Sequence, residues 1–357
     1  MLNLKSFMSD RVAIDLGTAN TRLYVQNEGI VIDEPSVVAV DLAIKPAGRV
    51  VAVGFEASSM LGKAPEHIRV IRPVRYGAIT DIDAACAMLS RFIHKARSRS
   101  RFSRFQAVIA VPAGISQIES HAVIEAAEAA GASRIQLLES TLAAALGADL
   151  PIGEPVCSMV VDIGGGTTEV AVMSLSGIVA SRSTRVAGDQ MNMAIKNYIR
   201  RRFDLLIGDS WAERAKTSVA NACPQSDENA TIEIRGRDVT SGIPKVILID
   251  THDIWEAMSD QINAIVQTAR SVLEEIPPEL SADVIDRGFL LTGGGALMTN
   301  LGLYLSTQLG IPAVIPVDPL STVLLGAAGA MNAMTDFSSH IIAGCSRAAR
   351  NIRPALV

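Results

Sequence analysis

Residues 160–178 read VVDIGGGTTEVAVMSLSGI, and this stretch decides the fold that we predict for the chain. Val160 and Val161 continue an apolar strand, Asp162 ends it, and a run of three glycines follows shortly after. Glycine tolerates positive φ and lets backbone N–H groups approach a bound anion, so this turn suits a phosphate. The alternation of residues 169–173 then predicts a second strand. The unit is strand–turn–strand, whereas Rossmann and Walker loops lead from a strand into a helix.

The same pattern occurs a second time near the N-terminus. Residues 14–21, IDLGTANT, align with residues 161–168, VDIGGGTT. Each copy continues into an alternating strand and a glycine turn. Two such units predict two related α/β domains that face each other, each offering a carboxylate and a phosphate loop to one ligand held between them.

The carboxylates of the two units imply a cation. Asp15 and Asp162 occupy equivalent positions, and two inward carboxylates beside a polyphosphate would repel it unless a hard, oxygen-seeking ion lay among them. We therefore predict Mg²⁺ at Asp15 and Asp162, held through water. A third glycine turn, TGGGA at residues 292–296, follows an apolar run and precedes a predicted helix over residues 297–309. This turn suits close approach of the backbone to a flat group such as adenosine.

Composition narrows the class of protein. The chain has 357 residues, of which 49% are hydrophobic, enough to fill the cores of two domains. A net charge of −5 argues against a nucleic-acid partner. The four cysteines form no CxxC pair, which favours free thiols in a reducing compartment. Since no apolar run has the length of a membrane span or of a signal-peptide core, we expect a cytoplasmic protein.

The three glycine segments carry a resemblance to a known family. Residues 15–21, 162–169 and 292–296 resemble the two phosphate segments and the adenosine segment of the actin and sugar-kinase ATPase superfamily. Within it, the chain resembles the bacterial actin MreB family from about residue 12 to about residue 333, including phrases such as DPLSTVLLG at residues 318–326. The resemblance implies an α/β, actin-like (ribonuclease H-like) fold with duplicated domains, a nucleotide cleft and four lobes.

The resemblance also implies domain boundaries. A first actin-like domain would span residues 1–145, with a small lobe inserted at about 33–100. A second would span residues 146–333, with its small lobe at about 188–260. Residues 334–357 would form a C-terminal tail.

By resemblance, the cleft holds ATP with Mg²⁺. Asp15 and Asp162 would bear on the metal, the two loops would hold the phosphates, and the nucleoside would lie between the TGGGA turn and the ERAK segment at residues 213–216. The predicted cofactor-binding residues are Gly17, Thr18, Ala19, Asn20, Gly164, Gly165, Gly166, Thr167, Thr168, Gly188, Glu213, Arg214, Ala215, Lys216, Gly293, Gly294, Gly295 and Ala296.

The chain departs from the family at the catalytic glutamate. The family has a Glu followed by Pro that orients the attacking water, and these positions fall on Ser140 and Thr141 here, with Glu139 one place too early. A helix advances about 100° per residue, so Glu139 would point elsewhere unless it lies in the loop before the helix. Ser140 can hydrogen-bond a water but cannot take its proton, so we predict slow hydrolysis unless Glu139 compensates. Alternatively, Ser140 is a helix N-cap. Thr167 occupies the family's other water-positioning place.

A basic and aromatic turn follows a predicted helix over residues 82–96. Arg101 and Arg104 lie beside Phe102 and Phe105. Aromatic rings among arginines favour an anionic membrane surface, where each basic residue contributes about 1 kcal/mol. The alternative is a solvated loop with one phenylalanine folded into the core. The family's corresponding loop contacts the membrane, so the resemblance implies binding to the inner membrane surface.

The resemblance implies homopolymeric filaments that lie under the inner membrane and direct cell-wall synthesis and cell shape, together with morphogenesis proteins. Two alternatives stay open. One is a small-molecule kinase of the same superfamily, which would stay monomeric in ATP and transfer phosphate. The other is a non-hydrolysing scaffold paralogue, for which Ser140 is the argument.

Overall fold

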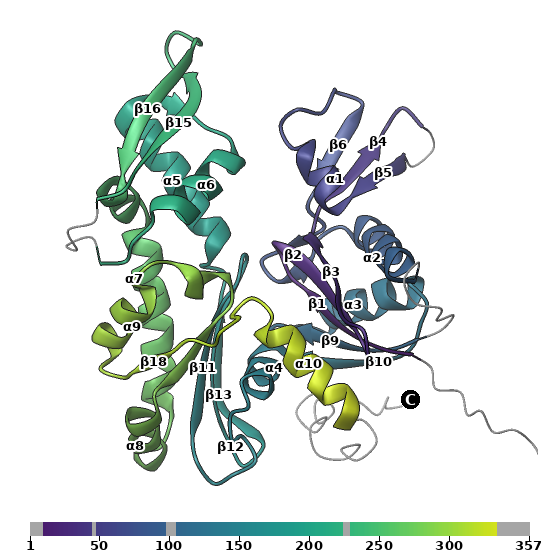
Figure 1. Ribbon diagram of the computed structural model, residues 1–357, viewed down its shortest axis with the longest axis vertical. Helices are drawn as coiled ribbons and strands as arrows, with labels where there is room; N and C mark the ends of the chain where they lie inside the picture. Colours follow the sequence, from purple (N-terminus) through teal and green to yellow (C-terminus); the bar gives the residue numbers. More distant parts are fainter. Residues whose placement is uncertain (1–9, 45–47, 98–104, 224–228, 334–357) are drawn as a thin grey trace, which may run out of the picture.

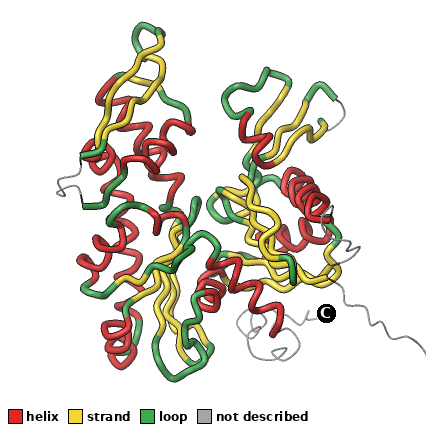
Figure 2. Tube along the Cα trace, in the orientation of Figure 1, coloured by secondary structure: helices red, strands yellow, loops and turns green. Residues whose placement is uncertain are grey.

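The computed structural model describes residues 10–44, 48–97, 105–223 and 229–333. Two five-stranded sheets form the centres of two domains, and a small lobe extends from each (Figure 1). Figure 2 shows the strands running together in each domain with the helices around them. No helix in the described ranges is long and apolar enough to cross a bilayer.

The two large sheets share one topology. The first has the order β10-β9-β1-β2-β3, and the second has the order β13-β12-β11-β17-β18. In each, a three-stranded antiparallel meander is extended by two parallel strands. This repeat confirms the duplicated α/β fold that the two glycine loops predicted. The strands are β1 (Asp10–Leu16), β2 (Asn20–Val25), β3 (Gly29–Pro35), β9 (Phe105–Val111), β10 (Ala132–Glu139), β11 (Ser158–Ile163), β12 (Thr168–Ser174), β13 (Gly177–Thr184), β17 (Phe289–Thr292) and β18 (Ala313–Val314).

Local capping fixes where the helices around these sheets begin. Asp81 Oδ1 accepts a hydrogen bond of 3.0 Å from the Ala84 N–H at the start of α2 (Ile82–Arg97). Capping boxes open α3 (Gln117–Ala129) and α7 (Thr251–Glu275), where side chains satisfy the first free N–H groups. A proline near the N-terminus starts α8 (Pro278–Arg287), since its missing N–H costs nothing there.

The small lobes are a three-stranded sheet each. In the first, β4 (Val38–Asp41), β5 (Arg49–Val53) and β6 (Ile68–Ile71) pack with α1 (Gly54–Ser59), and the hairpin β7 (Val74–Arg75) and β8 (Ala78–Ile79) follows. The second contains α5 (Gly188–Phe203), β14 (Leu205–Leu206), α6 (Asp209–Val219), β15 (Thr231–Asp238) and β16 (Pro244–Asp250).

Helices α4 (Ser140–Gly147) and α10 (Thr322–Ala333) cross between the two large sheets (Figure 1). A Cβ atom added at Gly326 would lie 1.7 Å from the Ala143 carbonyl oxygen, so the two backbones touch. One hydrophobic cluster contains buried residues of both sheets and of both helices. The Arg11 guanidinium also donates a hydrogen bond of 2.9 Å to the Met331 carbonyl oxygen. Helix α10 therefore returns to the first domain and ties the two halves together.

Two predictions from the sequence need correction. The helix predicted over residues 297–309 is divided into η1 (Gly294–Leu297) and α9 (Leu301–Leu309), because Asn300 adopts a left-handed φ of 59° that a helix cannot contain.

The prediction that Phe105 contacts a membrane was wrong. Phe105 is the first residue of β9, has an exposed fraction of 0%, and packs in the core of the first domain. Removing a large aromatic side chain from this core would cost several kcal/mol, about 3–5 for a truncation to alanine. The other predicted membrane residues, Arg101, Phe102 and Arg104, lie outside the described residues.

Candidate nucleotide-binding site

The structure brings the two glycine loops into contact. The first loop joins β1 to β2, and the second joins β11 to β12. A Cβ atom added at Gly165 would lie 2.9 Å from the Ala19 Cβ, and one added at Gly166 would lie 2.4 Å from the Thr18 Oγ1. Both loops therefore border one spot between the domains, and glycine is required where they meet.

Backbone N–H groups of these loops are available to an anion. Within the ranges that the structure describes, those of Ala19, Gly165 and Gly166 donate no hydrogen bond to another residue. The Gly17 carbonyl oxygen, in contrast, is engaged, since it accepts a hydrogen bond of 2.6 Å from the Ser36 hydroxyl. Successive unpaired N–H groups in a turn form the concave anion site that phosphates occupy in other proteins.

The start of α5 supports the second loop. The Gly188 N–H donates to the Gly164 carbonyl oxygen at 3.2 Å, and the Asp189 N–H donates to the Gly165 carbonyl oxygen at 2.7 Å. These bonds turn the loop's carbonyl groups toward the helix. The structure thus places Gly188, a predicted cofactor-binding residue, behind the loop with its own N–H engaged.

Three carboxylates lie beside the loops, of which Glu169 is buried and Asp15 and Asp162 are partly buried. Burial raises the pKa of Asp15 to about 6, although Arg22, 4.0 Å away, lowers it. Burial and then the charge of Asp15 raise the pKa of Asp162 to about 7. Burial and then the charge of Asp162 raise the pKa of Glu169, its partner across β11 and β12, to about 8.

This acidic cluster fits a cation. Carboxylates that raise one another's pKa do not all ionise at neutral pH, and a nearby cation would favour their charged forms. In the described part of the chain, no three His, Cys, Asp or Glu side chains are arranged to ligate a metal directly. The residues therefore suit a hard ion that keeps part of its water shell, as Mg²⁺ does.

The cluster predicts a pH dependence of stability. The folded-state pKa values of about 6 to 8 exceed the value near 4 expected in an unfolded chain, so the folded state holds more protons between about pH 4 and pH 8. In magnesium-free buffer, loss of these protons should lower the melting temperature as pH rises through that window. Above about pH 8 the cluster should cause no further change in the melting temperature. Asp162→Asn removes one such group, so the melting temperature of this variant should rise relative to that of the wild type between pH 5 and pH 8. A difference that does not change with pH would contradict the buried cluster.

Glu139 is the last residue of β10 and the N-cap of α4, so it does lie just before the helix. Its Oε2 atom is buried and accepts no hydrogen bond within the described residues, and burial raises its pKa. Ser140 is the first helical residue, and its hydroxyl donates to the Val111 carbonyl oxygen at 3.0 Å. The hypothesis that Ser140 is the N-cap was therefore wrong, and its one proton is used to hold α4 to β9.

Sequence reasoning missed Glu169. Its carboxylate accepts a hydrogen bond of 3.3 Å from the Thr167 hydroxyl, and its side chain is almost completely buried. The available signal was a charged residue at an inward position of an otherwise apolar strand, β12. Such a residue rarely stays buried without a partner or a function.

The TGGGA turn packs directly on β11. A Cβ atom added at Gly293 would lie 2.4 Å from the Ile163 carbonyl oxygen, and one added at Gly295 would lie 2.4 Å from the Ile163 Cγ2. Gly293 also has a φ of 79°. Gly293 and Gly295 are therefore required by their packing on β11, whether or not a ligand binds. A Cβ atom added at Gly294 would meet only Leu320, at 3.7 Å.

The ERAK segment lies on α6 and faces α5 in part. Glu213 accepts hydrogen bonds from Asn192 at 2.6 Å and from Lys216 at 2.8 Å. Lys216 also donates to the Gly188 carbonyl oxygen at 3.1 Å, so its side chain lies at the start of α5, which is hydrogen-bonded to the second loop. Arg214 lies over the Trp211 ring instead. Ala215 is fully buried, so its side chain packs in the core.

A segment of the first small lobe reaches across to the second domain. Arg72 forms an ion pair of 3.3 Å with Asp189 at the start of α5. The Gly77 N–H donates to the Thr18 hydroxyl at 3.1 Å, and a Cβ atom added at Gly77 would lie 3.0 Å from the Thr167 methyl group. Residues 72–77 thus touch both glycine loops and bridge the two domains.

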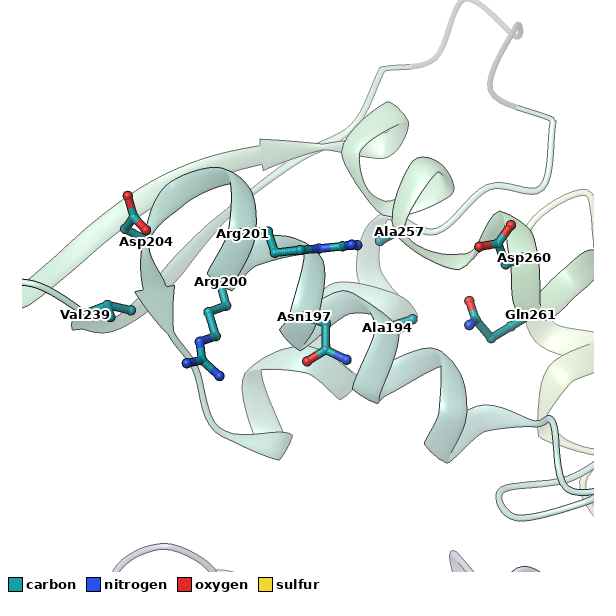
Figure 3. A pocket seen from close by; sticks show the side chains of 9 residues that line it. All are labelled: Ala194, Asn197, Arg200, Arg201, Asp204, Val239, Ala257, Asp260 and Gln261. Atoms are coloured by element: carbon teal, nitrogen blue, oxygen red, sulfur yellow. The ribbon is translucent and has the colours of Figure 1, made fainter.

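A cavity of about 670 Å³ lies elsewhere, between α5 of the second small lobe and α7 (Figure 3). Arg200 and Arg201 line it together with Asp204 and Asp260. None of the lining residues belongs to the glycine loops, so the cavity is separate from the candidate nucleotide site. Its two arginines and two aspartates balance in charge, so the lining favours neither anions nor cations.

Two duplicated α/β domains, with their glycine loops in contact beside a shared acidic cluster, define an actin-like protein of the nucleotide-binding class. A family model described as MreB/Mbl protein matches residues 9–339. The chain belongs to the MreB/Mbl family, as the sequence resemblance predicted.

Relatives and a solved structure agree with this assignment. The cell shape-determining protein MreB of Escherichia coli (strain K12) is 45% identical over 331 residues, which cover 92% of this chain and 94% of that protein. The cell shape-determining protein Mbl of Bacillus subtilis (strain 168) is 45% identical over 315 residues, covering 88% and 93%. MreB5 of Spiroplasma citri bound to AMPPNP superposes with a TM-score of 0.86 at 32% identity, covering 92% of this chain and 97% of that one. These matches confirm the actin-like fold.

Proposed function

We propose that the chain binds ATP with Mg²⁺ between its glycine loops and polymerises with copies of itself into filaments. The observation that carries the nucleotide site is the contact between two loops whose unpaired N–H groups lie beside the acidic cluster. MreB5 of Spiroplasma citri, solved with the ATP analogue AMPPNP and with ADP, supports a nucleotide as the anion. Asp15 and Asp162 would hold Mg²⁺ and its waters, and the ion would supply charge neutralisation for the β- and γ-phosphates.

Filaments of this kind would lie in the cytoplasm against the inner face of the cell membrane and direct cell shape and cell-wall synthesis with morphogenesis proteins. The names of the relatives in Escherichia coli and Bacillus subtilis support the role in cell shape. The arginine and phenylalanine pattern at Arg101, Phe102 and Arg104 supports contact with anionic lipids.

Sedimentation tests the assembly part of the proposal. Protein mixed with ATP and Mg²⁺ should pellet as polymer, and less should pellet when the metal is chelated. Protein that binds ATP but stays monomeric at every concentration, while passing phosphate to a small molecule, would instead favour the kinase alternative.

The bridge formed by residues 72–77 couples the site to the angle between the domains. Because this segment touches both loops, phosphate binding would fix the first small lobe relative to the second domain. If the angle between the domains determines the surface at which subunits meet, contacts between subunits in a filament would depend on the bound nucleotide.

Arg72→Ala should speed the release of ATP. Both partners of the Arg72–Asp189 ion pair are about 30% exposed, so its loss should cost at most about 1 kcal/mol, or about fivefold in rate. Stopped-flow release of a fluorescent ATP analogue would measure this. Arg69→Ala is the control, since Arg69 is an exposed residue of β6 for which no ion pair exists within the described residues. Equal release rates for the two variants would contradict the bridge.

A scaffold that binds ATP but turns it over little is a second candidate function. The Ser140 hydroxyl favours it, because its proton is committed to the Val111 carbonyl oxygen and no carboxylate stands at that position. Phosphate release by the wild type and by Ser140→Glu separates the two candidates. A large gain in the variant would support the scaffold, and no gain would point to hydrolysis through other residues.

A further inference from the structure

The hydroxyl group of Thr167 has a fixed hydrogen-bond partner. Its Oγ1 donates to Glu169 Oε1 at 3.3 Å, and the other carboxylate oxygen of Glu169 accepts from the Ala113 N–H at 3.2 Å. The Glu169 residue is 3% exposed. Two donors from separate segments, the second glycine loop just before β12 and the turn after β9, therefore hold this carboxylate in one orientation.

This contact decides what Thr167 can do. A hydroxyl group has one proton to donate and two lone pairs that accept. A cation at the acidic cluster would favour the ionised form of Glu169, which takes the Thr167 proton as a hydrogen bond, so Oγ1 can then act toward a ligand only as an acceptor. An acceptor can hold an O–H of water, whereas it would repel an oxygen of the γ-phosphate. The Thr167 methyl group also packs against Gly77, which restricts rotation of the side chain.

We propose that Glu169 is a positioning residue for ATP hydrolysis, acting through Thr167 to orient the attacking water. The inference rests on the proposed ATP binding. In the reaction, the water oxygen bonds to the γ-phosphorus and the bond from that phosphorus to the bridging oxygen breaks. ADP leaves with the electron pair, and the water proton ends on the released phosphate. Glu169 exchanges no proton in this step, because it only fixes the direction of the Thr167 hydroxyl.

The hydrogen bonds of neighbouring residues favour the Thr167–Glu169 pair as the group that orients the water. Ser140 has spent its only proton on the Val111 carbonyl oxygen. Glu139 lies close enough for its charge to act on Glu169, so the position one residue before the missing glutamate contributes a carboxylate to the same neighbourhood. The Thr167–Glu169 pair is the one hydroxyl–carboxylate contact that the structure describes within the second glycine loop and the strand that follows it.

Glu169→Gln tests the proposal, because glutamine keeps the shape but offers one acceptor to two donors. We expect single-turnover phosphate release to slow by about tenfold or more, with the dissociation constant of ATP changed less than about twofold. Glu279→Gln on the exposed part of α8 is the control and should match the wild type.

A double-variant cycle separates positioning from a structural effect. Thr167→Val keeps the methyl group but removes the hydroxyl, so adding Glu169→Gln to it should slow release no further. Independent, multiplying effects would overturn the inference, as would a weaker ATP affinity with an unchanged rate. Wild-type protein that binds ATP but releases no phosphate would overturn the inference while leaving the proposed binding intact. Wild-type protein that binds no ATP would overturn both.

Discussion

Gly326→Ala should be among the most destabilising single changes in the chain, with an expected loss of about 3 kcal/mol in the free energy of unfolding. The added Cβ would lie 1.7 Å from the Ala143 carbonyl oxygen and 2.7 Å from the Gly147 nitrogen. Both are backbone atoms, so no side-chain rotation can relieve the overlap, and α4 and α10 must separate. Because the cluster around these helices joins both large sheets, the damage should extend to both domains.

The matched control lies on the same helix. Gly329 is exposed on α10, and a Cβ added there meets no atom within 4 Å. Gly329→Ala should be neutral or stabilise by about 0.5–1 kcal/mol, since alanine favours helices. Thermal melting followed by circular dichroism should give a melting temperature about 6–12 °C lower for Gly326→Ala. Equal melting temperatures for the two variants would mean that the helix crossing is not tight.

Gly166→Ala should have the largest effect on ligand binding. Its Cβ would lie 2.4 Å from the Thr18 Oγ1 and 2.8 Å from the Tyr76 nitrogen. The two loops must then move apart, and their N–H groups would no longer face one phosphate together. We expect the affinity for ATP to fall by about 100-fold, which corresponds to about 2.7 kcal/mol.

Gly177→Ala is the control for this loss. Gly177 lies at the turn between β12 and β13, and the nearest atom to an added Cβ is the Ser174 oxygen at 3.6 Å. Fluorescence titration with an ATP analogue should give wild-type affinity for this variant. If Gly166→Ala also bound normally, the contact between the loops would have no part in binding.

Local patterns were sufficient to predict the fold. A strand that ends at a carboxylate, a glycine turn and a second strand are all short-range features, and they recur in β1–β2 and β11–β12 as expected. The contact between the two loops also followed, because duplicated units in one chain tend to face each other. The helix predicted to begin at Leu297 begins at Leu301, since nothing in the local pattern reveals the left-handed conformation of Asn300.

The parts that the sequence could not predict depend on distant contacts. The sequence left open whether the phenylalanines beside the arginines contact a membrane or one of them folds into the core, and the position of β9 in the sheet shows that Phe105 is buried. The Arg72–Asp189 ion pair joins residues 117 positions apart. Glu169 looked like an ordinary member of an alternating strand until its partners, Thr167 and Ala113, were placed around it.

Equilibrium dialysis of the wild-type protein against ATP, with and without Mg²⁺, tests the central claim most directly. The account predicts one ATP retained per chain in the presence of Mg²⁺ and clearly weaker retention when the metal is chelated. A folded protein that retains no ATP with Mg²⁺ present would contradict the account, because the paired loops and the carboxylates beside them would then have no shared ligand.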